Sequence, residues 1–395
     1  MADNKENKVL NVPALRFPGF KNSWDCTILE KLSKKIGDGI HSTPSYDDDG
    51  TFYFINGNNL NRGKIVITSS TKRVSEKEAY KNNAENLEAD SILMSINGTI
   101  GNVALYNNEP IMLGKSACYI NSKDNVDKKF LFYYLQYPKT QSYFEAELTG
   151  TTIKNLSLQS IRKTKICIPT IEEQHKISHF LQKIDERIAT QNKIIEDWKK
   201  LKSAIVEELY SATKGETYSF RQLLEVVNEK NRKLEYTNVL SASQELGMIK
   251  RSDINIDIKF EQDSICGYKI VRNGDYVVHL RSFQGGFAFS DKTGICSPAY
   301  TILRPNDLVV YGYLSHFFTS RLFIKSLKLV TYGIRDGRSI NVDEWLNMTV
   351  ILPTIQEQLH IIEIINSISS KLYNETRIYD SLLRQKSYLL KAMFI

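Results

Sequence analysis

The sequence predicts an α+β protein in which two similar globular domains are separated by two long antiparallel coiled-coil helices with pseudo-two-fold symmetry. Three observations predict this fold class: a ten-residue box that occurs twice, a heptad pattern after each copy, and short β-type runs that repeat at nearly the same offset. The period is far longer than that of solenoid repeats, so each half of the chain is a domain with an appended element.

The box is the clearest internal repeat. Residues 168–177 read IPTIEEQHKI and residues 352–361 read LPTIQEQLHI, so the two prolines lie 353 − 169 = 184 positions apart. The offset holds without a gap to the last residues of the chain. Internal symmetry of this kind indicates two equivalent halves.

A helical heptad pattern follows each box. Residues spaced alternately four and three apart form an a/d seam over more than four heptads, which is typical of two helices that pack along a stripe. The polar interruptions also coincide, Gln191 with Glu375 and Lys202 with Lys386. Two matched seams are expected to bury each other through Ile184, Ile188, Ile195, Trp198, Ile205, Ile368, Leu372, Tyr379, Leu382 and Leu389. Each helix has about 40 residues and is therefore roughly 60 Å long. Antiparallel packing is favoured, because parallel packing would crowd both domains together.

The globular parts repeat more weakly, at an offset of 275 − 90 = 185. Residues 53–57, 89–94 and 101–104 align with residues 238–242, 274–279 and 286–289, and their β-type composition with Gly-Asp and Asn-Gly punctuation predicts strands joined by turns. Helices are expected at 130–135 and 313–318. The predicted organisation is a flexible N-terminus (1–12), a first domain (13–167), a first helix (168–212), a second domain (213–351) and a second helix (352–395).

Composition restricts the function only loosely. The net charge of +7 permits a nucleic-acid partner without demanding one. The five cysteines (Cys26, Cys118, Cys167, Cys266, Cys296) have no CxxC spacing, which favours buried thiols in a reducing compartment over a disulfide or zinc framework. The polar start and the lack of an 18-residue apolar run predict a cytoplasmic protein.

Catalytic signatures are absent from the sequence. No two prolines are adjacent, which excludes the Asp/Asn-Pro-Pro-aromatic motif of methyltransferases. Gly114-Lys115-Ser116 resembles the end of a phosphate-binding loop, but Glu109 stands where that loop needs glycine. His175 and His179 have the spacing of helical metal ligands, yet they are expected to face solvent, and the sequence implies no carboxylate second shell for them. We therefore predict no catalytic residue, no metal and no cofactor in this chain.

Several loops carry side chains that suit DNA. Asn pairs with adenine and Arg with guanine in the major groove, while Lys contacts phosphates. The first domain offers Asn58, Asn59, Asn61, Arg62, Lys64, Lys72, Arg73, Asn97, Thr99, Thr151, Thr152 and Lys154. The second domain offers Arg281, Ser282, Gln284, Lys328, Arg335 and Arg338. Ordinary solvated turns and charge runs are the alternative for each group. Lys154 and Arg338 occupy equivalent loops, which favours binding.

The sequence resembles the specificity subunit of Type I restriction–modification enzymes. The resemblance rests on the opening Pro13-Ala14-Leu15-Arg16-Phe17-Pro18-Gly19-Phe20 with Trp24, on the two Pro-Thr-Ile-x-Glu-Gln boxes that head heptad helices, and on the Gly/Ala-Asp strands followed by a glycine turn. It covers nearly the whole chain.

This resemblance implies a non-catalytic reader of double-stranded DNA. Each target-recognition domain would read one half of a bipartite, asymmetric site, and the paired helices would fix the gap between the halves. Two adenine-N6 methyltransferase subunits would dock on the helices, and ATP-dependent restriction subunits on that core. S-adenosylmethionine, ATP and Mg would be used by those partners. The family gives no invariant base-reading residues to transfer to this chain.

Two other readings compete with this one. A self-contained restriction–methylation enzyme would need catalytic motifs that the sequence lacks. A plain coiled-coil adaptor would show no sequence preference on DNA, even together with methyltransferase partners.

Overall fold

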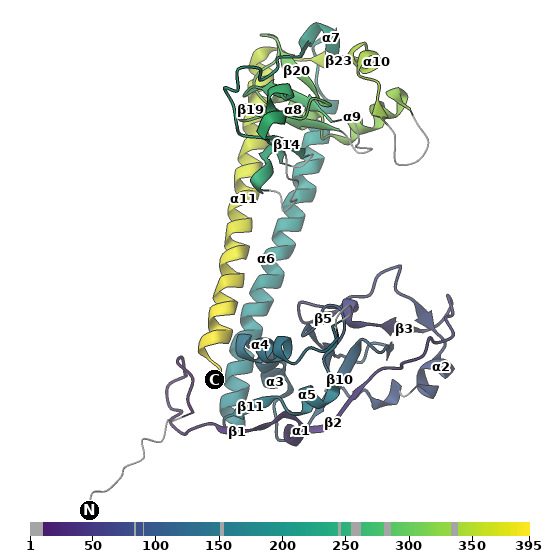
Figure 1. The fold of residues 1–395 in the computed structure, drawn as a ribbon, viewed down its shortest axis with the longest axis vertical. Coiled ribbons are helices and arrows are strands. Elements are labelled where there is room, and N and C mark those ends of the chain that lie inside the picture. The colour runs from purple at the N-terminus through teal and green to yellow at the C-terminus, as the bar shows by residue number, and fades with distance from the viewer. Residues whose placement is uncertain are drawn as a thin grey trace, which may run out of the picture. The chain divides into compact units, whose positions relative to one another are not determined.

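A computed structural model describes residues 11–395 apart from residues 83, 90, 151–153, 244–245, 254–261, 280–285 and 333–338. The chain forms two compact units. Unit 1 comprises Met1–Gln191 and Ile378–Ile395, and unit 2 comprises Asn192–Arg377. Two long helices, α6 (Ile171–Ser211) and α11 (Ile355–Ala392), each contribute one part to each unit (Figure 1).

The two helices pack antiparallel within each unit. In unit 1, Ile177 near the start of α6 shares a core with Met393 beyond the end of α11. In unit 2, Val206 near the end of α6 shares a core with Ile361 near the start of α11. The predicted antiparallel packing is therefore confirmed in each unit. All ten residues predicted to pack the helices together are buried or half-buried.

The first residues of the boxes explain why both helices begin there. Glu172 and Glu173 lie in the first turn of α6, where carboxylates interact favourably with the helix dipole. At the start of α11, the Glu357 carboxylate accepts hydrogen bonds from the Thr354 backbone N–H (3.1 Å) and hydroxyl (2.9 Å), while the Glu357 N–H donates to the Thr354 hydroxyl (3.3 Å). This reciprocal arrangement is a capping box.

Unit 1 is built on a four-stranded antiparallel sheet of order β2-β10-β7-β8, beside a β6-β3-β9 sheet and the β1–β11 and β4–β5 pairs. Its strands are β1 (Asp25–Ile28), β2 (Ser33–Asp38), β3 (Phe52–Ile55), β4 (Leu60–Asn61), β5 (Lys64–Ile65), β6 (Arg73–Val74), β7 (Ser91–Ser95), β8 (Val103–Leu105), β9 (Ile111–Leu113), β10 (Ala117–Ser122) and β11 (Lys165–Ile168). Its other helices are α1 (Leu29–Leu32), η1 (Gly57–Asn59), α2 (Glu76–Lys81), η2 (Ala84–Asn86), α3 (Lys128–Leu135), α4 (Pro138–Ala146) and α5 (Leu158–Arg162).

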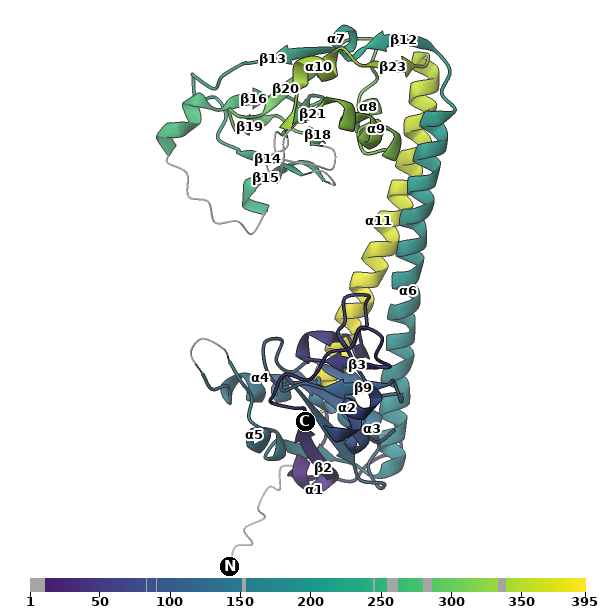
Figure 2. The ribbon, with the colours of Figure 1, turned by 90° about the vertical axis from the view of Figure 1, so that its right-hand side faces the viewer.

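Unit 2 contains a four-stranded sheet of order β13-β20-β17-β18 and the β12–β23, β14–β15, β16–β19 and β21–β22 pairs. Its strands are β12 (Glu216–Ser219), β13 (Leu224–Val227), β14 (Leu240–Ser243), β15 (Gly247–Lys250), β16 (Lys269–Val271), β17 (Tyr276–Val278), β18 (Phe287–Phe289), β19 (Gly294–Cys296), β20 (Thr301–Pro305), β21 (Thr331–Tyr332), β22 (Ser339–Ile340) and β23 (Thr349–Leu352). Its helices are α7 (Phe220–Leu223), η3 (Arg251–Asp253), η4 (Gln262–Gly267), α8 (Tyr313–Phe317), α9 (Arg321–Ser326), η5 (Leu327–Val330) and α10 (Val342–Leu346). Figure 2 shows α8 and α9 beside the helix pair of this unit.

The two units share one plan. The order β2-β10-β7-β8 matches β13-β20-β17-β18, and β1–β11 matches β12–β23. The registers of the last two pairs also agree, since Asp25 faces Ile168 and Glu216 faces Leu352. The weak sequence repeat between the globular parts is therefore a structural repeat.

The N-terminal segment of residues 11–24 packs on unit 1. The Leu15 backbone N–H donates to the Ala392 carbonyl at 2.8 Å, and Trp24 is buried with its ring 6.5 Å from that of Phe394. Arg16 donates two hydrogen bonds of 2.7 Å to the buried carboxylate of Glu173 in the first box. The motif that opens the sequence thus joins the end of α11 to the start of α6.

The cysteine prediction is wrong. Cys26 and Cys167 form a disulfide between β1 and β11, where the two residues face each other in the strand register. They are 141 positions apart in the sequence, so no local cysteine spacing indicated that they pair. Cys266 is exposed, which also departs from the prediction, whereas Cys118 and Cys296 are buried as expected. Burial raises the pKa of both buried thiols to about 12.

Candidate nucleic-acid interface

Each globular part is held to its helix by the glutamine of the box. In unit 1, the Gln174 amide oxygen accepts from the Asp127 backbone N–H just before α3 (3.0 Å), and its amide nitrogen donates to the Pro169 carbonyl (2.9 Å). In unit 2, Gln358 accepts from the Val310 N–H (2.8 Å) and donates to the Pro353 carbonyl (3.0 Å). Both side chains are fully buried, so each glutamine orients one domain on its helix.

Four segments of unit 1 meet at one end of its four-stranded sheet: η1, the turn 96–101, the turn 114–116 and residues 154–155. The Thr99 hydroxyl donates to the Gly57 carbonyl (3.1 Å), and the Gly57 N–H donates to the Ser116 hydroxyl (2.8 Å). The Ile96 N–H donates to the Ser116 carbonyl (2.9 Å), and Asn97 pairs with Asn155. We call these four segments the loop cluster. It brings the predicted residues Asn58, Asn97, Thr99 and Lys154 together.

Two of the predicted asparagines cannot present both ends of the side-chain amide to a base. The Asn59 amide oxygen accepts from the Asn56 N–H (3.0 Å), and its nitrogen donates to the Val66 carbonyl (3.1 Å). The Asn97 amide oxygen is buried without a hydrogen-bond partner in the described part of the chain. A bidentate contact with adenine needs both ends of the amide, so neither residue can make one in this conformation.

The β4–β5 hairpin carries the next predicted residues. Its turn consists of Arg62 and Gly63, both with positive φ (48° and 81°), as expected for a two-residue hairpin turn. The Arg62 guanidinium donates to the Tyr379 hydroxyl of α11 at 2.8 Å, within unit 1. Asn61 and Lys64, which flank this turn, are exposed.

Lys72 and Arg73 lie apart from the loop cluster, at strand β6. Each cation stacks on an aromatic ring, Lys72 at 5.8 Å from the centre of Tyr46 and Arg73 at 5.2 Å from that of Tyr53. Such stacking orders a long side chain while leaving its charge able to meet a phosphate.

Sequence reasoning missed Lys115 as a member of the loop cluster. Lys115 is exposed between β9 and β10, next to Ser116, whose hydroxyl donates to the Asn56 amide oxygen at 2.8 Å. The Gly-Lys-Ser tripeptide drew attention only as an incomplete phosphate-binding loop. The tripeptide lies between two strands and is near the Asn-rich segment in space but not in sequence. The sequence alone could not predict this proximity.

Most predicted residues of unit 2 lie outside the described residues. These are Arg281, Ser282, Gln284, Arg335 and Arg338, and in unit 1 the same holds for Thr151 and Thr152. Lys328 is described and is exposed in η5.

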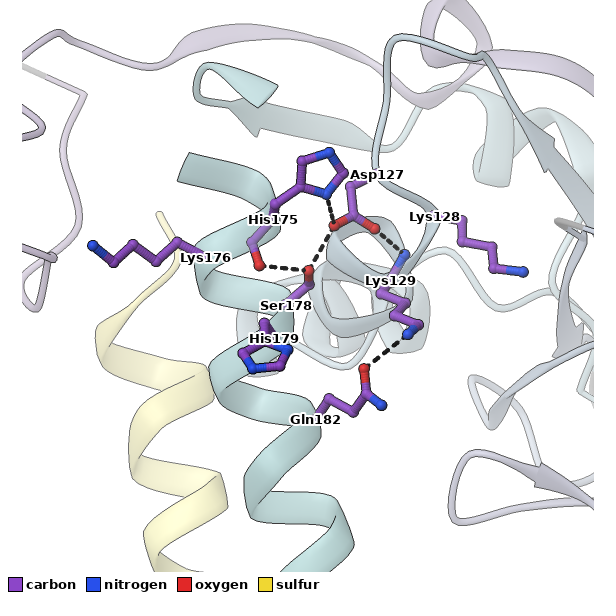
Figure 3. A pocket seen from close by; sticks show the side chains of 8 residues that line it. All are labelled: Asp127, Lys128, Lys129, His175, Lys176, Ser178, His179 and Gln182. Carbon is purple, nitrogen blue, oxygen red and sulfur yellow. Dashed lines mark hydrogen bonds and ion pairs between the residues drawn. The ribbon is translucent and has the colours of Figure 1, made fainter. Parts of the chain in front are cut away.

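A groove of about 570 Å³ lies where α3 meets α6 in unit 1 (Figure 3). His175 Nδ1 lies 2.9 Å from the Asp127 carboxylate, which also accepts from the Ser178 hydroxyl at 2.6 Å. His175 is exposed as expected, and the sequence did not imply its carboxylate partner, Asp127, whose backbone N–H is bound by Gln174 of the same helix. Ser178 bonds to Asp127 and not to the imidazole, so these three residues form no nucleophile–base pair.

Neither a metal-binding cluster nor a membrane-spanning helix is present among the described residues. No three His, Cys, Asp or Glu side chains gather there as a metal-binding group. No helix among them is long and apolar enough to cross a membrane.

The chain is similar in sequence to proteins of one family. The model of the Type I restriction modification DNA specificity domain matches residues 29–199. The Type I restriction enzyme MjaVIII specificity subunit of Methanocaldococcus jannaschii is 24% identical over 404 residues, which cover 93% of this chain and 90% of that protein. A putative type I specificity subunit of Mycoplasma pneumoniae is 27% identical over 166 residues, but the match spans only 39% of its length and 41% of this chain.

Solved structures show the same fold along the whole chain. The Type I restriction–modification S subunit of M. genitalium has a TM-score of 0.54 at 17% identity and covers 97% of this chain and 99% of its own. A chain from a study of assembly and conformational transition of the type I system has a TM-score of 0.58 at 15% identity, with 96% and 98% coverage. The duplicated units, the paired helices and the matching sequences agree, and the chain is similar in sequence and in fold to Type I restriction–modification specificity subunits.

Proposed function

We propose that this chain is the DNA sequence-specificity subunit of a Type I restriction–modification complex and that each unit reads one half of a bipartite site. The observation that carries the proposal is one fold repeated with different surface residues. Gln174 and Gln358 make the same contacts in both units, whereas the exposed loops differ in sequence. Equal scaffolds with unequal surfaces suit an asymmetric site.

The loop cluster is the proposed DNA-contacting surface of unit 1. Asn58, Lys115 and Lys154 are exposed there, and the Thr99 hydroxyl oxygen keeps acceptor capacity after donating to Gly57. Asn58 and Thr99 would face base edges, and the lysines would contact phosphates. Lys64, Lys72 and Arg73 would add phosphate contacts outside the cluster. In unit 2, the corresponding role falls to Arg281, Ser282, Gln284, Lys328, Arg335 and Arg338.

The helix pair is the proposed spacer and docking platform. Helices packed along a heptad seam resist bending, so they would hold the gap between half-sites constant. Two adenine-N6 methyltransferase subunits would dock on this pair, with ATP-dependent restriction subunits on that core. In this arrangement the chain performs no chemistry, and S-adenosylmethionine, ATP and Mg serve its partners.

A double variant of the loop cluster tests the DNA-contacting role. Lys115→Ala with Lys154→Ala should weaken binding of the first half-site and lower the slope of log affinity against log salt by about 0.9 for each phosphate that is no longer neutralised. Footprinting should show the second half-site unchanged. Lys21→Ala is the control, because Lys21 is exposed on the N-terminal segment of the same unit. An unchanged salt slope in the double variant would refute this surface.

A further inference from the structure

Lys386 of α11 sits in a complete polar site in unit 1. Its ammonium lies 2.7 Å from the Asp185 carboxylate of α6 and donates to the Gln136 side chain at 3.2 Å. The Tyr133 hydroxyl of α3 donates to the same carboxylate at 2.9 Å, and the ammonium lies 5.6 Å from the centre of the Tyr133 ring. The Asp185 carboxylate of α6 is therefore bound by both Lys386 of α11 and Tyr133 of α3.

Unit 2 keeps the lysine and replaces the other members. Along the helices the offset is 184, so Lys202 corresponds to Lys386 and Ser369 to Asp185. Ring contacts fix the correspondence of α8 with α3: Tyr134 contacts Phe394 (5.3 Å) as Phe317 contacts Tyr210 (5.4 Å). His316 therefore stands in the place of Tyr133, and Thr319 in that of Gln136.

The carboxylate is the member that unit 2 lacks. Ser369 donates its hydroxyl to the Ile365 carbonyl of its own helix at 2.7 Å. Glu207, the acid one turn further along α6, is occupied by the Arg321 and Leu322 backbone N–H groups. Among the described residues, no carboxylate forms an ion pair with Lys202. Burial lowers the pKa of Lys202, while burial followed by repulsion from Lys202 lowers the pKa of His316 to about 4.

We propose that Lys202 and His316 form a carboxylate-binding site in unit 2, filled by an Asp or Glu side chain of a protein that docks on the helix pair. Unit 1 shows which ligand the site accepts, because Asp185 occupies the equivalent position there. The surroundings favour a protein over a free carboxylate. Leu201 precedes Lys202 on α6 and is 46% exposed, Leu322 on α9 is 48% exposed, and apolar side chains of this size contribute to the cores of protein interfaces.

Titration with sodium acetate tests the chemistry of the site. The full chain, labelled on histidine, is titrated with acetate against chloride at constant ionic strength, and the His316 ring signals are followed by NMR. A saturable shift of His316 is expected, with its pKa rising because a nearby anion stabilises the imidazolium. Lys202→Met should abolish the response. The proposed site would be refuted if acetate and chloride shifted the His316 signals equally. It would also be refuted if the response to acetate in Lys202→Met were as large as in the wild type.

A charge exchange between the units sharpens this test. Ser369→Asp supplies the missing carboxylate, so it should remove the acetate response, whereas Ser369→Asn matches it in size without the charge and should retain the response. Asp185→Ser makes unit 1 resemble unit 2, and acetate should then raise the melting temperature of unit 1. Acetate binding to the Ser369→Asp variant at wild-type strength would contradict the assignment.

Docking of an adenine-N6 methyltransferase subunit of the proposed complex tests the source of the carboxylate, and this arm rests on the proposed function. Lys202→Met and Ser369→Asp should each weaken docking at unit 2 by about tenfold or more, as expected when one partner of a desolvated charge pair is removed or displaced. Ser369→Asn should dock as the wild type does. Wild-type affinity in both charge variants would overturn a protein carboxylate as the ligand. Failure of the wild type itself to dock would instead count against the proposed function.

Discussion

Gln174 and Gln358 are separated by 184 positions, yet they make the same pair of hydrogen bonds in the two units. Each accepts from a backbone N–H of the globular part and donates to the carbonyl of the box proline. The box is therefore a joint between domain and helix. This explains why its sequence is repeated more closely than that of the domains that it carries.

Loss of this joint should destabilise the unit concerned. Gln358→Ala leaves the part-buried N–H of Val310 without its partner, which costs about 1–3 kcal/mol. Urea unfolding followed by tryptophan fluorescence should show an earlier transition. Gln356→Ala, two residues away and exposed, should stay within about 0.5 kcal/mol of the wild type. Equal effects of the two variants would contradict the joint.

The ion pair between Arg16 and Glu173 makes a second prediction. The Glu173 side chain is 1% exposed, so Arg16→Ala leaves a buried carboxylate without its counter-charge, at a cost of about 3–5 kcal/mol. Thermal unfolding should show a lower melting temperature for unit 1. Lys21→Ala, on the same segment but exposed, should melt as the wild type does. A stable Arg16→Ala variant would show that the N-terminal segment is dispensable for unit 1.

Much of the fold can be read from the sequence. The heptad spacing of apolar residues predicted the buried seam correctly. Helix periodicity is local, so each position depends on few neighbours. The box glutamines illustrate the limit. Their repetition was visible, but their partners Asp127 and Val310 lie 47 and 48 positions away. Only the folded chain shows what they bind.

The candidate interface was harder to predict for the same reason. The composition of residues 58–64 suits DNA, yet Asn59 is occupied by its own loop and Arg62 by Tyr379. Lys115 joins the loop cluster through contacts between separate turns. The Cys26–Cys167 disulfide likewise depends on the register of two strands that are distant in sequence. Long-range pairing of this kind leaves no local pattern.

The disulfide should stabilise unit 1 alone. It closes a loop of 141 residues, and the chain-entropy model gives roughly 5 kcal/mol for a loop of that order. Cys26→Ser with Cys167→Ser should lower the melting temperature of unit 1, as should reduction of the wild type. Thiol titration of the denatured protein should find two more thiols per chain after reduction than before. An unchanged thiol count would show that the disulfide does not form.

The length of the helices should set the gap between half-sites. Insertion of seven residues after Gln191 and of seven after Arg377 keeps the a/d seam and lengthens each helix by about 10.5 Å. The preferred gap should grow by about three base pairs, at roughly 3.4 Å per base pair. Selection from a DNA library with randomised gaps measures this. Four-residue insertions at the same places interrupt the seam and should lower stability instead. An unchanged gap in the seven-residue variant would show that the helices do not act as a spacer.

The central claim is that two copies of one fold read two different half-sites. Genome-wide mapping of N6-methyladenine in cells with and without the gene tests it most directly. The account predicts that a single motif disappears with the gene, consisting of two unequal half-sites separated by a fixed, unspecified gap. A palindromic or uninterrupted motif, or an identical methylation pattern in both strains, would contradict it.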